Sequence, residues 1–253
     1  LPNHPRTICD AIGDLLSLDA RVPDHEVAGW PTKYDAVMRA IGPGQKLCNV
    51  RHSATSVYTW QIPETFGVVS QRQTQILQTI ARNRRHSRYG RLSNGNPIPV
   101  HEVERLCGLT DIDIDVTELI RSGYLKEKND GVDLKGAMFC SGLFKRVLWD
   151  GQSPTVLTNF HNPRFFLHPL ANRPFSLREC ARLQTFPDSF RFQSSSVSLI
   201  DGYRLVGNAV PPVLSRAFAD AVHQMLVDEE EICSFHRNDT PDFARTATTE
   251  SAL

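Results

Sequence analysis

Six arginines lie close together in one stretch of the chain, with a spacing that fits contact with phosphate groups. No Asp or Glu occurs between Phe66 and His101, so no acid within the stretch offsets their charge. A block of one charge attracts a polyanion such as a nucleic acid. The same residues also fit a solvated helix whose cations lie near its negative C-terminal dipole, and both interpretations stay open. The arginines are Arg72, Arg82, Arg84, Arg85, Arg88 and Arg91.

A second unusual combination is Y-R-L-V-G-N-A-V-P-P at residues 203–212. Proline suits the first turn of a helix, and glycine and asparagine suit tight backbone turns. We therefore expect a helix from Pro211 to about Leu226, with Gly207 and Asn208 just before its start. On spacing alone this is an ordinary loop-to-helix junction. The apolar stripe expected for the helix is Leu214, Ala217, Phe218, Ala221, Val222 and Met225.

The cysteines are too widely separated for a disulfide framework or a zinc site. None of the six forms a C-x-x-C pair, so buried, reduced thiols in a cytosolic protein are the default expectation. Lys plus Arg equals Asp plus Glu, so the net charge indicates no polyanionic partner. With 40% apolar and 22% charged residues in 253, the chain has the composition of a globular protein with one large or two small domains. No apolar run approaches the roughly 20 residues that span a bilayer.

The middle of the chain predicts three helices followed by a hairpin. The first, within residues 70–91, has an apolar face at Ile76, Leu77, Ile80 and Ala81, and the next two cover about 100–106 and 115–123. Two short strands then flank the Asn-Asp-Gly turn at residues 129–131. This is the order of a winged helix, a fold that often holds nucleic acid. Its recognition stretch is acidic, so we favour the arginine helix and the loop after it as the surface that faces DNA; the acids are Asp111, Asp113, Asp115 and Glu118.

The flanking regions predict further short elements. An amphipathic helix is expected at residues 7–16, and strands are expected at 147–149 and 155–158. Ser176 and Glu179 have the spacing of a capping box, so a helix should start there and end near Thr185, before Pro187. After Asp228 the chain is acidic and then rich in Ser and Thr, so residues 228–253 are expected to be disordered.

Two of these motifs carry a family resemblance. Residues 173–192, R-P-F-S-L-R-E-C-A-R-L-Q-T-F-P-D-S-F-R-F, followed by residues 203–212, resemble the last two conserved blocks of DNA (cytosine-5)-methyltransferases. Residues 153–169 look like the end of that family's target-recognition domain, and residues 7–15 are similar to the segment that leads into it. The resemblance is looser over the first 150 residues.

The resemblance implies an α/β methyltransferase fragment with a winged-helix-like α+β target-recognition domain and a C-terminal helical segment of the catalytic domain. Residues 1–50 would lead in from the catalytic domain. Residues 51–170 would form the recognition domain, winged-helix-like at 70–135. Residues 171–227 would hold the C-terminal motifs and the closing helix, before the tail.

The resemblance also implies roles for single residues. The final motif would line one wall of the S-adenosylmethionine pocket with Gly207, Asn208, Ala209 and Val210, where glycine permits close approach of the backbone. The upstream motif would organise the recognition domain through a structural set of Ser176, Arg178, Glu179 and Arg182. Thr155, followed by Val156, resembles a pair found near the DNA base, although an ordinary strand threonine fits as well.

The parts of that family that perform the chemistry do not occur in this sequence. The family's nucleophile lies in a Pro-Cys dipeptide, and no cysteine here follows a proline. The Glu-Asn-Val motif, the cofactor glycine loop and the Q-x-R-x-R block are absent as well. The sequence is therefore expected to be a C-terminal portion, either a subunit of a split enzyme or a truncated copy, that is inactive without an N-terminal half carrying the Pro-Cys nucleophile.

The resulting hypothesis is the recognition half of a bacterial restriction–modification methyltransferase. Such a protein binds a specific site in double-stranded DNA, works in the cytoplasm on the nucleoid, and contributes no catalytic residue of its own. A different class, a non-catalytic winged-helix regulator or degenerate remnant, is the alternative, supported by the three-helix and hairpin order. An assembly subunit that binds a partner and no DNA is a third hypothesis. Nothing in the sequence indicates which bases are recognised.

Overall fold

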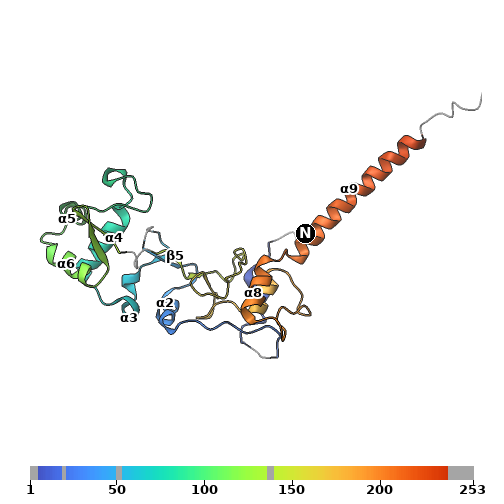
Figure 1. Cartoon of the computed structure of the whole chain (residues 1–253), viewed down its shortest axis with the longest axis horizontal. Coiled ribbons are helices and arrows are strands. Elements are labelled where there is room, and N and C mark those ends of the chain that lie inside the picture. Colours follow the sequence, from blue (N-terminus) through green and yellow to red (C-terminus); the bar gives the residue numbers. More distant parts are fainter. Residues whose placement is uncertain (1–4, 19–20, 50–52, 136–139, 239–253) are drawn as a thin grey trace, which may run out of the picture. The chain divides into compact units, whose positions relative to one another are not determined.

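The computed structural model describes residues 5–18, 21–49, 53–135 and 140–238, with side chains to Asp228. It has mixed α/β structure with small sheets, shown in Figure 1. The chain divides into two compact units, one reaching to Ala209 and one beginning at Val210, and each is described by itself. Three apolar clusters make the core of the first unit.

The first cluster holds three helices and a hairpin together. The helices pack through Ile76, Leu77, Val103, Val116 and Leu119, all buried. They contact one another and the strands, so the segment forms one lobe with its own core. The predicted order of three helices and a hairpin is confirmed. The elements are α4 (Gln71–Asn83), α5 (Val100–Cys107), α6 (Asp113–Arg121), β3 (Leu125–Lys128) and β4 (Gly131–Leu134).

Helix α4 forms where its apolar spacing and its cap agree. The Ser70 hydroxyl accepts a hydrogen bond from the Gln73 main-chain N–H, and the Gln73 side chain accepts one from the Ser70 N–H. Ile76, Leu77, Ile80 and Ala81 are all buried, as their spacing predicts. The helix ends at Asn83, and the arginines beyond it lie in a loop that contains the short turn η3 (Ser87–Tyr89).

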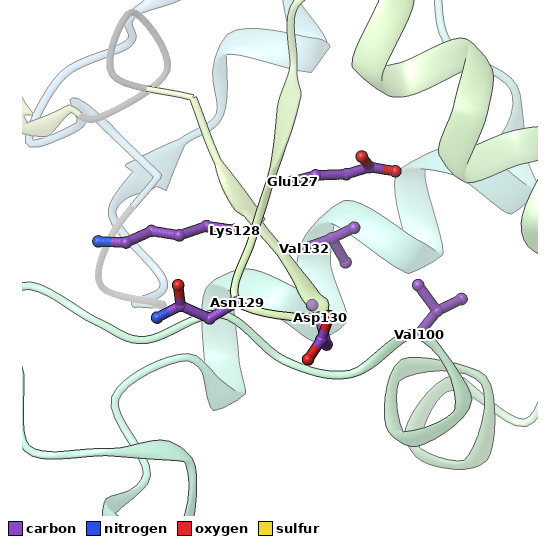
Figure 2. Close-up of a pocket in the computed structure, with 7 residues that line it drawn as sticks. Val100, Glu127, Lys128, Asn129, Asp130 and Val132 are labelled. Carbon is purple, nitrogen blue, oxygen red and sulfur yellow. The ribbon is translucent and has the colours of Figure 1, made fainter.

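The hairpin turns where the sequence predicts it. Asn129 and Asp130 both have positive φ, 50° and 56°, the backbone that a two-residue hairpin loop requires. Figure 2 shows Glu127 and Lys128 extending to opposite sides, as successive strand residues do. Val132 also pairs with Ile98, which lies between α4 and α5. A Cβ at Gly131 would lie 2.8 Å from the Ile98 carbonyl carbon, so only glycine fits there.

The second cluster surrounds a small mixed sheet. Strand order is β2–β1–β5, with β1 parallel to β2 and antiparallel to β5, while β6 pairs in parallel with β7. Val37 and Met38 of α2 (Asp35–Ala40) pack here with Leu47, Phe144 and Leu167. The strands are β1 (Lys46–Cys48), β2 (Ser56–Val57), β5 (Ser141–Leu143), β6 (Lys145–Arg146) and β7 (Phe166–Leu167). Short helices η1 (Thr32–Tyr34), η2 (Thr59–Gln61) and α3 (Pro63–Phe66) connect these parts.

The strands predicted at residues 147–149 and 155–158 are wrong. The carbonyl groups of Trp149 and Gly151 accept hydrogen bonds from the N–H groups of Cys9 and Ile8, 3.0 and 2.9 Å away. These bonds satisfy the first turn of α1 (Ile8–Ile12), so the backbone here serves a helix end and joins no sheet. Pro154 follows and has no N–H to offer a neighbouring strand.

The third cluster joins the beginning of the chain to its last third. Ile8 and Ile12 of α1 pack with Phe175, Cys180 and Tyr203, all fully buried. Helix α1 contacts α7 (Leu177–Leu183), which contacts α8 (Leu199–Asn208). Helix α1 is shorter than the predicted 7–16, because Gly13 ends it, and α7 ends close to the predicted Thr185.

Helix α8 was not predicted, and it changes the position of the glycine–asparagine pair. Gly207 and Asn208 are the last two residues of α8, whereas the sequence placed them just before a helix. A local signal does mark α8. The Ser198 hydroxyl caps it by accepting from the Asp201 N–H, and Tyr203 and Val206 follow at helical spacing on its buried face.

The second unit contains one long helix, α9 (Pro212–Asn238). It starts one residue after the predicted Pro211 and continues past Leu226 into the acidic segment expected to be disordered. Glutamate is a strong helix former, and no Gly or Pro lies between Pro212 and Pro241, so nothing local ends the helix at residue 226. The remainder of the predicted tail, residues 239–253, lies outside the described residues.

Candidate functional site

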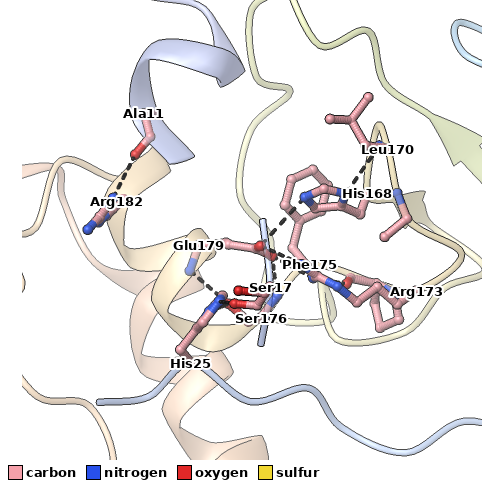
Figure 3. A network of polar contacts seen from close by, with 12 residues as sticks. Ala11, Ser17, His25, His168, Leu170, Arg173, Phe175, Ser176, Glu179 and Arg182 are labelled. Carbon is pink, nitrogen blue, oxygen red and sulfur yellow. Dashed lines mark hydrogen bonds and ion pairs between the residues drawn. The ribbon is translucent and has the colours of Figure 1, made fainter. Parts of the chain in front are cut away.

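Glu179 is the centre of a buried polar network at the start of α7. Its carboxylate accepts two hydrogen bonds from the Arg173 guanidinium, at 2.8 and 2.7 Å, and one from the Ser176 main-chain N–H at 2.7 Å. The Ser176 hydroxyl accepts from the Glu179 N–H, so the predicted capping box is confirmed. It also lies 2.8 Å from His25 Nδ1. Figure 3 shows these side chains converging on the helix end.

His168 closes the same network as a neutral ring. Burial lowers the pKa of His168 to about 4. Its Nδ1 accepts hydrogen bonds from the N–H groups of Leu170 and Ala171, so its proton is on Nε2. That atom lies 3.5 Å from Glu179 Oε1, which is longer than a normal hydrogen bond. The network therefore orders the 168–179 backbone.

Arg178 and Arg182 tie α7 to distant segments. Arg178 is fully buried and donates to Asp24 Oδ2 at 3.0 Å and to the Phe190 carbonyl at 2.8 Å. Arg182 bonds Asp188 through two nitrogens, at 2.9 and 2.6 Å, and also bonds Asp14. Its hydrogen bonds hold the pKa of Asp188 below the usual value. Neither guanidinium is free to bind a ligand in this arrangement.

Gly207 packs against its own chain. A Cβ at this position would lie 2.3 Å from the Thr158 nitrogen and 2.5 Å from the Leu157 carbonyl carbon, both main-chain atoms. The glycine therefore lets α8 approach the loop that follows Thr155. Asn208 is exposed, Ala209 is partly buried, and Val210, the first residue of the other unit, is 60% exposed. The cofactor role of these four residues stays a prediction.

A Gly207→Ala substitution is expected to lower the free energy of unfolding by about 1–3 kcal/mol, because backbone must shift to admit the methyl group. Urea denaturation followed by circular dichroism measures this. Gly29→Ala is the matched control, since Gly29 is exposed and a Cβ there meets nothing within 4 Å. Equal midpoints for the two variants would contradict the close packing of α8.

The structure separates the six arginines into different environments. Arg84 is buried and forms a bidentate ion pair with Asp133, at 2.7 and 2.8 Å, so the interpretation of Arg84 as a phosphate contact is corrected to a core ion pair. Arg72 is paired as well, with Asp115 at 3.1 Å and with the Thr110 carbonyl. Two acids of the predicted recognition stretch, Asp115 and Glu118, thus bond to α4 and help to hold it against α6.

The other four arginines remain near the surface. Arg82 and Arg91 are exposed, and Arg85 is half-buried. Arg88 is exposed too, with its guanidinium carbon 4.6 Å from the Tyr89 ring centroid and a long ion pair of 3.8 Å to Glu102. Once the closer ion pairs of Arg72 and Arg84 are set aside, the arginines that remain available for phosphate are Arg82, Arg85, Arg88 and Arg91.

Thr155 is exposed, whereas its neighbour Val156 is buried in the third cluster. Val156 thus anchors the pair in the core, and the Thr155 side chain faces solvent. Both residues lie in a loop and not in a strand. The pair's predicted place near a DNA base is not decided by this geometry.

Two buried cysteines, Cys140 and Cys180, are poor nucleophiles. Burial raises the pKa of Cys140 to about 11 and that of Cys180 well above its ordinary value, so both thiols stay protonated at neutral pH. Over the described part of the chain, no group of three or more His, Cys, Asp or Glu side chains is placed to hold a metal ion. No helix among the described residues is long and apolar enough to cross a bilayer.

A comparison with known proteins identifies the family to which the chain belongs. Residues 45–224, more than half of the chain, match the family described as C-5 cytosine-specific DNA methylase. The chain belongs to this family. The resemblance of residues 173–192 and 203–212 to DNA (cytosine-5)-methyltransferases is thereby confirmed at the family level. C-5 cytosine-specific DNA methylases act on DNA and normally use S-adenosylmethionine as methyl donor.

Individual relatives match over different lengths. Type II methyltransferase M.HgiBI of Herpetosiphon aurantiacus is 28% identical over 214 residues, covering 74% of this chain and 46% of the relative. DNA (cytosine-5)-methyltransferase 1 of Mus musculus is 46% identical over 80 residues, covering 30% of this chain and 5% of the relative. The chain spans about half the length of the first curated relatives that it matches. This methylase-family chain therefore corresponds to a part of the length of such relatives.

Proposed function

We propose that this chain supplies the DNA-recognition and closing portion of a DNA (cytosine-5)-methyltransferase of the restriction–modification type. The family match over residues 45–224 carries the proposal. Type II relatives matched over 74% of the chain favour restriction–modification, and a bacterial cytoplasm with nucleoid DNA is the corresponding setting.

DNA binding is proposed for a winged-helix-like lobe at residues 70–135. The pairing of Ile98 with Val132 adds a third strand position between α4 and α5, which supports that description. Phosphate contacts would come from Arg82, Arg85, Arg88 and Arg91, because these guanidinium groups are near the surface and close in sequence. Thr155 would contribute from a loop whose neighbour Val156 fixes its position.

The cofactor role is proposed for the segment of residues 207–210. Asn208 fits one wall of a nucleoside site because its amide is exposed at the end of α8. A cavity of about 360 Å³ beside Ala209 is lined by Phe186, Phe190 and Phe192, which offers an apolar aromatic surface of the kind that accepts a flat ring. Bound S-adenosylmethionine would supply the methyl group for C5 of cytosine, and this chain would hold and orient that donor.

The nucleophilic thiolate is proposed to come from a second polypeptide or segment with a Pro-Cys dipeptide. The sequence supports this, because no cysteine here follows a proline, and burial keeps the thiols of Cys140 and Cys180 protonated. The second unit offers an apolar surface on which that second polypeptide could dock. The side chains of Leu214, Phe218 and Met225 on helix α9 are 44–67% exposed, and exposed apolar residues of this kind often form protein–protein contacts.

Reconstitution tests the proposal. The full chain mixed with a matching N-terminal methyltransferase half should transfer tritiated methyl groups from S-adenosylmethionine to duplex DNA, whereas neither part alone should do so. Asn208→Ala should raise KM for S-adenosylmethionine several-fold and leave the Kd for DNA unchanged, because only the amide that faces the donor is lost. The double variant Arg82→Gln and Arg91→Gln should raise the Kd for DNA and leave KM for S-adenosylmethionine unchanged. DNA binding without any transfer would instead identify a non-catalytic regulator.

A further inference from the structure

A cationic cavity lies in the sheet region, in a different part of the sequence from the arginines. It has a volume of about 660 Å³ and is formed by β1, by β6 and by the loop of residues 148–154, in which the exposed Asp150 does not line the cavity. Its cations are Lys46, Lys145 and Arg146, and no described residue that lines it is acidic. A concave surface with one sign of charge concentrates the opposite ion.

The two lysines converge on one glycine. Gly142 has a φ of +105°, and a Cβ added to it would lie 3.5 Å from Lys46 Cδ and 3.6 Å from Lys145 Cε. Both side chains therefore run past the same point of β5, with no side chain at Gly142 to separate them. Two lysine stems that pass the same residue bring two positive charges to one region of the surface, and an anion bound there would offset their repulsion.

Main-chain hydrogen bonds between strands hold the backbone of both lysines in place. The Lys46 N–H donates to the Thr55 carbonyl at 3.0 Å, beside the pairing of β1 with β2, and Lys145 pairs with Phe166 in β7. The Lys145 ammonium lies 5.7 Å from the Phe166 ring centroid, a cation–π contact that restrains its stem. A site held in place before binding loses less entropy when the ligand arrives.

Arg146 adds a permanent positive charge behind the lysines. It is buried, and its five hydrogen bonds go to oxygen atoms of neutral groups only: the carbonyls of Met38, Ile41, His168 and Ala171 and the amide of Asn172. No carboxylate neutralises it among these partners, so its charge still contributes to the potential of the cavity.

We propose that Lys46 and Lys145 form a phosphate site that grips one backbone phosphodiester of the bound DNA. The inference rests on the proposed function, and it adds to the arginine surface a second anchor on the sheet region. The chemistry recognised is the phosphate monoanion, whose two free oxygens could each accept a hydrogen bond from one of the two lysines. Inorganic phosphate shares this chemistry and serves as a probe of the site alone.

The test measures how DNA affinity depends on salt. The full chain is titrated into a fluorescein-labelled duplex over a series of NaCl concentrations, with Lys46→Gln, Lys145→Gln and the double variant. Each lost phosphate contact reduces the slope of log K against log salt by about 0.9, and two lysines on one phosphate should reduce it by about 0.9 together. Lys33→Gln is the matched control, because Lys33 is exposed and does not line the cavity.

A second readout separates the site from the proposed function. Lysine acylation followed by mass spectrometry should show Lys46 and Lys145 protected by duplex DNA and by inorganic phosphate, with Lys33 equally reactive throughout. If Arg82→Gln and Arg91→Gln lower the salt slope and the lysine variants do not, the phosphate site is overturned and the proposed function stands. If the chain binds no duplex, the proposed function fails. Protection by inorganic phosphate then still supports an anion site, and its absence overturns that site too.

Discussion

Glu179→Gln is expected to lower the free energy of unfolding by about 3–5 kcal/mol, although the two side chains have almost the same shape. The substitution removes the charge that compensates Arg173, whose side chain is 8% exposed, and it turns an amide N–H₂ toward donors. The remaining amide oxygen can still accept from the Ser176 N–H, but the N–H₂ group then faces the Arg173 Nη2 donor, and the buried guanidinium has lost its counter-charge. Urea denaturation followed by circular dichroism and tryptophan fluorescence gives the change in midpoint.

The control for this prediction is a partly exposed carboxylate side chain, that of Glu102. Glu102→Gln removes a partner of Arg105, 2.9 Å away, on the surface of α5, and should hardly change the urea midpoint. Replacing both buried partners, with Arg173→Met and Glu179→Leu together, should recover part of the loss, because no lone charge then remains inside. If Glu179→Gln unfolds at the same urea concentration as Glu102→Gln, the network around α7 does not stabilise the fold.

The local signals of the sequence were sufficient for several elements. The apolar spacing at Ile76 and Ile80, the turn at Asn129 and Asp130, and the Ser176 capping box each involve residues within one or two turns of each other. Such interactions are decided by backbone propensity and side-chain reach, which a single stretch of sequence contains. These elements can therefore be predicted from the sequence alone.

Long-range partners explain what the sequence could not decide. Arg84 was assigned to a phosphate-facing block because its neighbours are basic, but its partner Asp133 is 49 residues further along the chain. The carbonyls of Trp149 and Gly151 bond to α1, 140 and 143 residues away in sequence, and so form no strand. Helix α8 differs, because its Ser198 cap is a local signal. The two prolines at 211 and 212 correctly indicate the start of α9, but Gly207 and Asn208 before them end α8 and do not form a loop.

Arg146 gives the second large expected effect, because one guanidinium holds three segments together. Its nitrogens donate to the carbonyls at the end of α2, Met38 and Ile41, and to the loop at His168, Ala171 and Asn172, all at 2.6–2.7 Å. Carbonyl groups at the C-terminal end of a helix carry partial negative charge, which favours a cation there. Five donors in a fixed plane suit this set, and no other side chain has them.

Arg146→Met should therefore cost more than about 4 kcal/mol of unfolding free energy, since four main-chain carbonyls lose a donor and each unsatisfied group costs about 1–3 kcal/mol. Arg146→Lys should cost less, because three of the donors and the charge remain. Arg39→Lys, at an exposed position in the same helix α2, is the control and should leave the urea midpoint unchanged. The expected order of increasing stability is Arg146→Met, then Arg146→Lys, then the wild type, and this order is the test. If lysine restored full stability, a single charge rather than the planar set of five donors would be what joins α2 to the 168–172 loop.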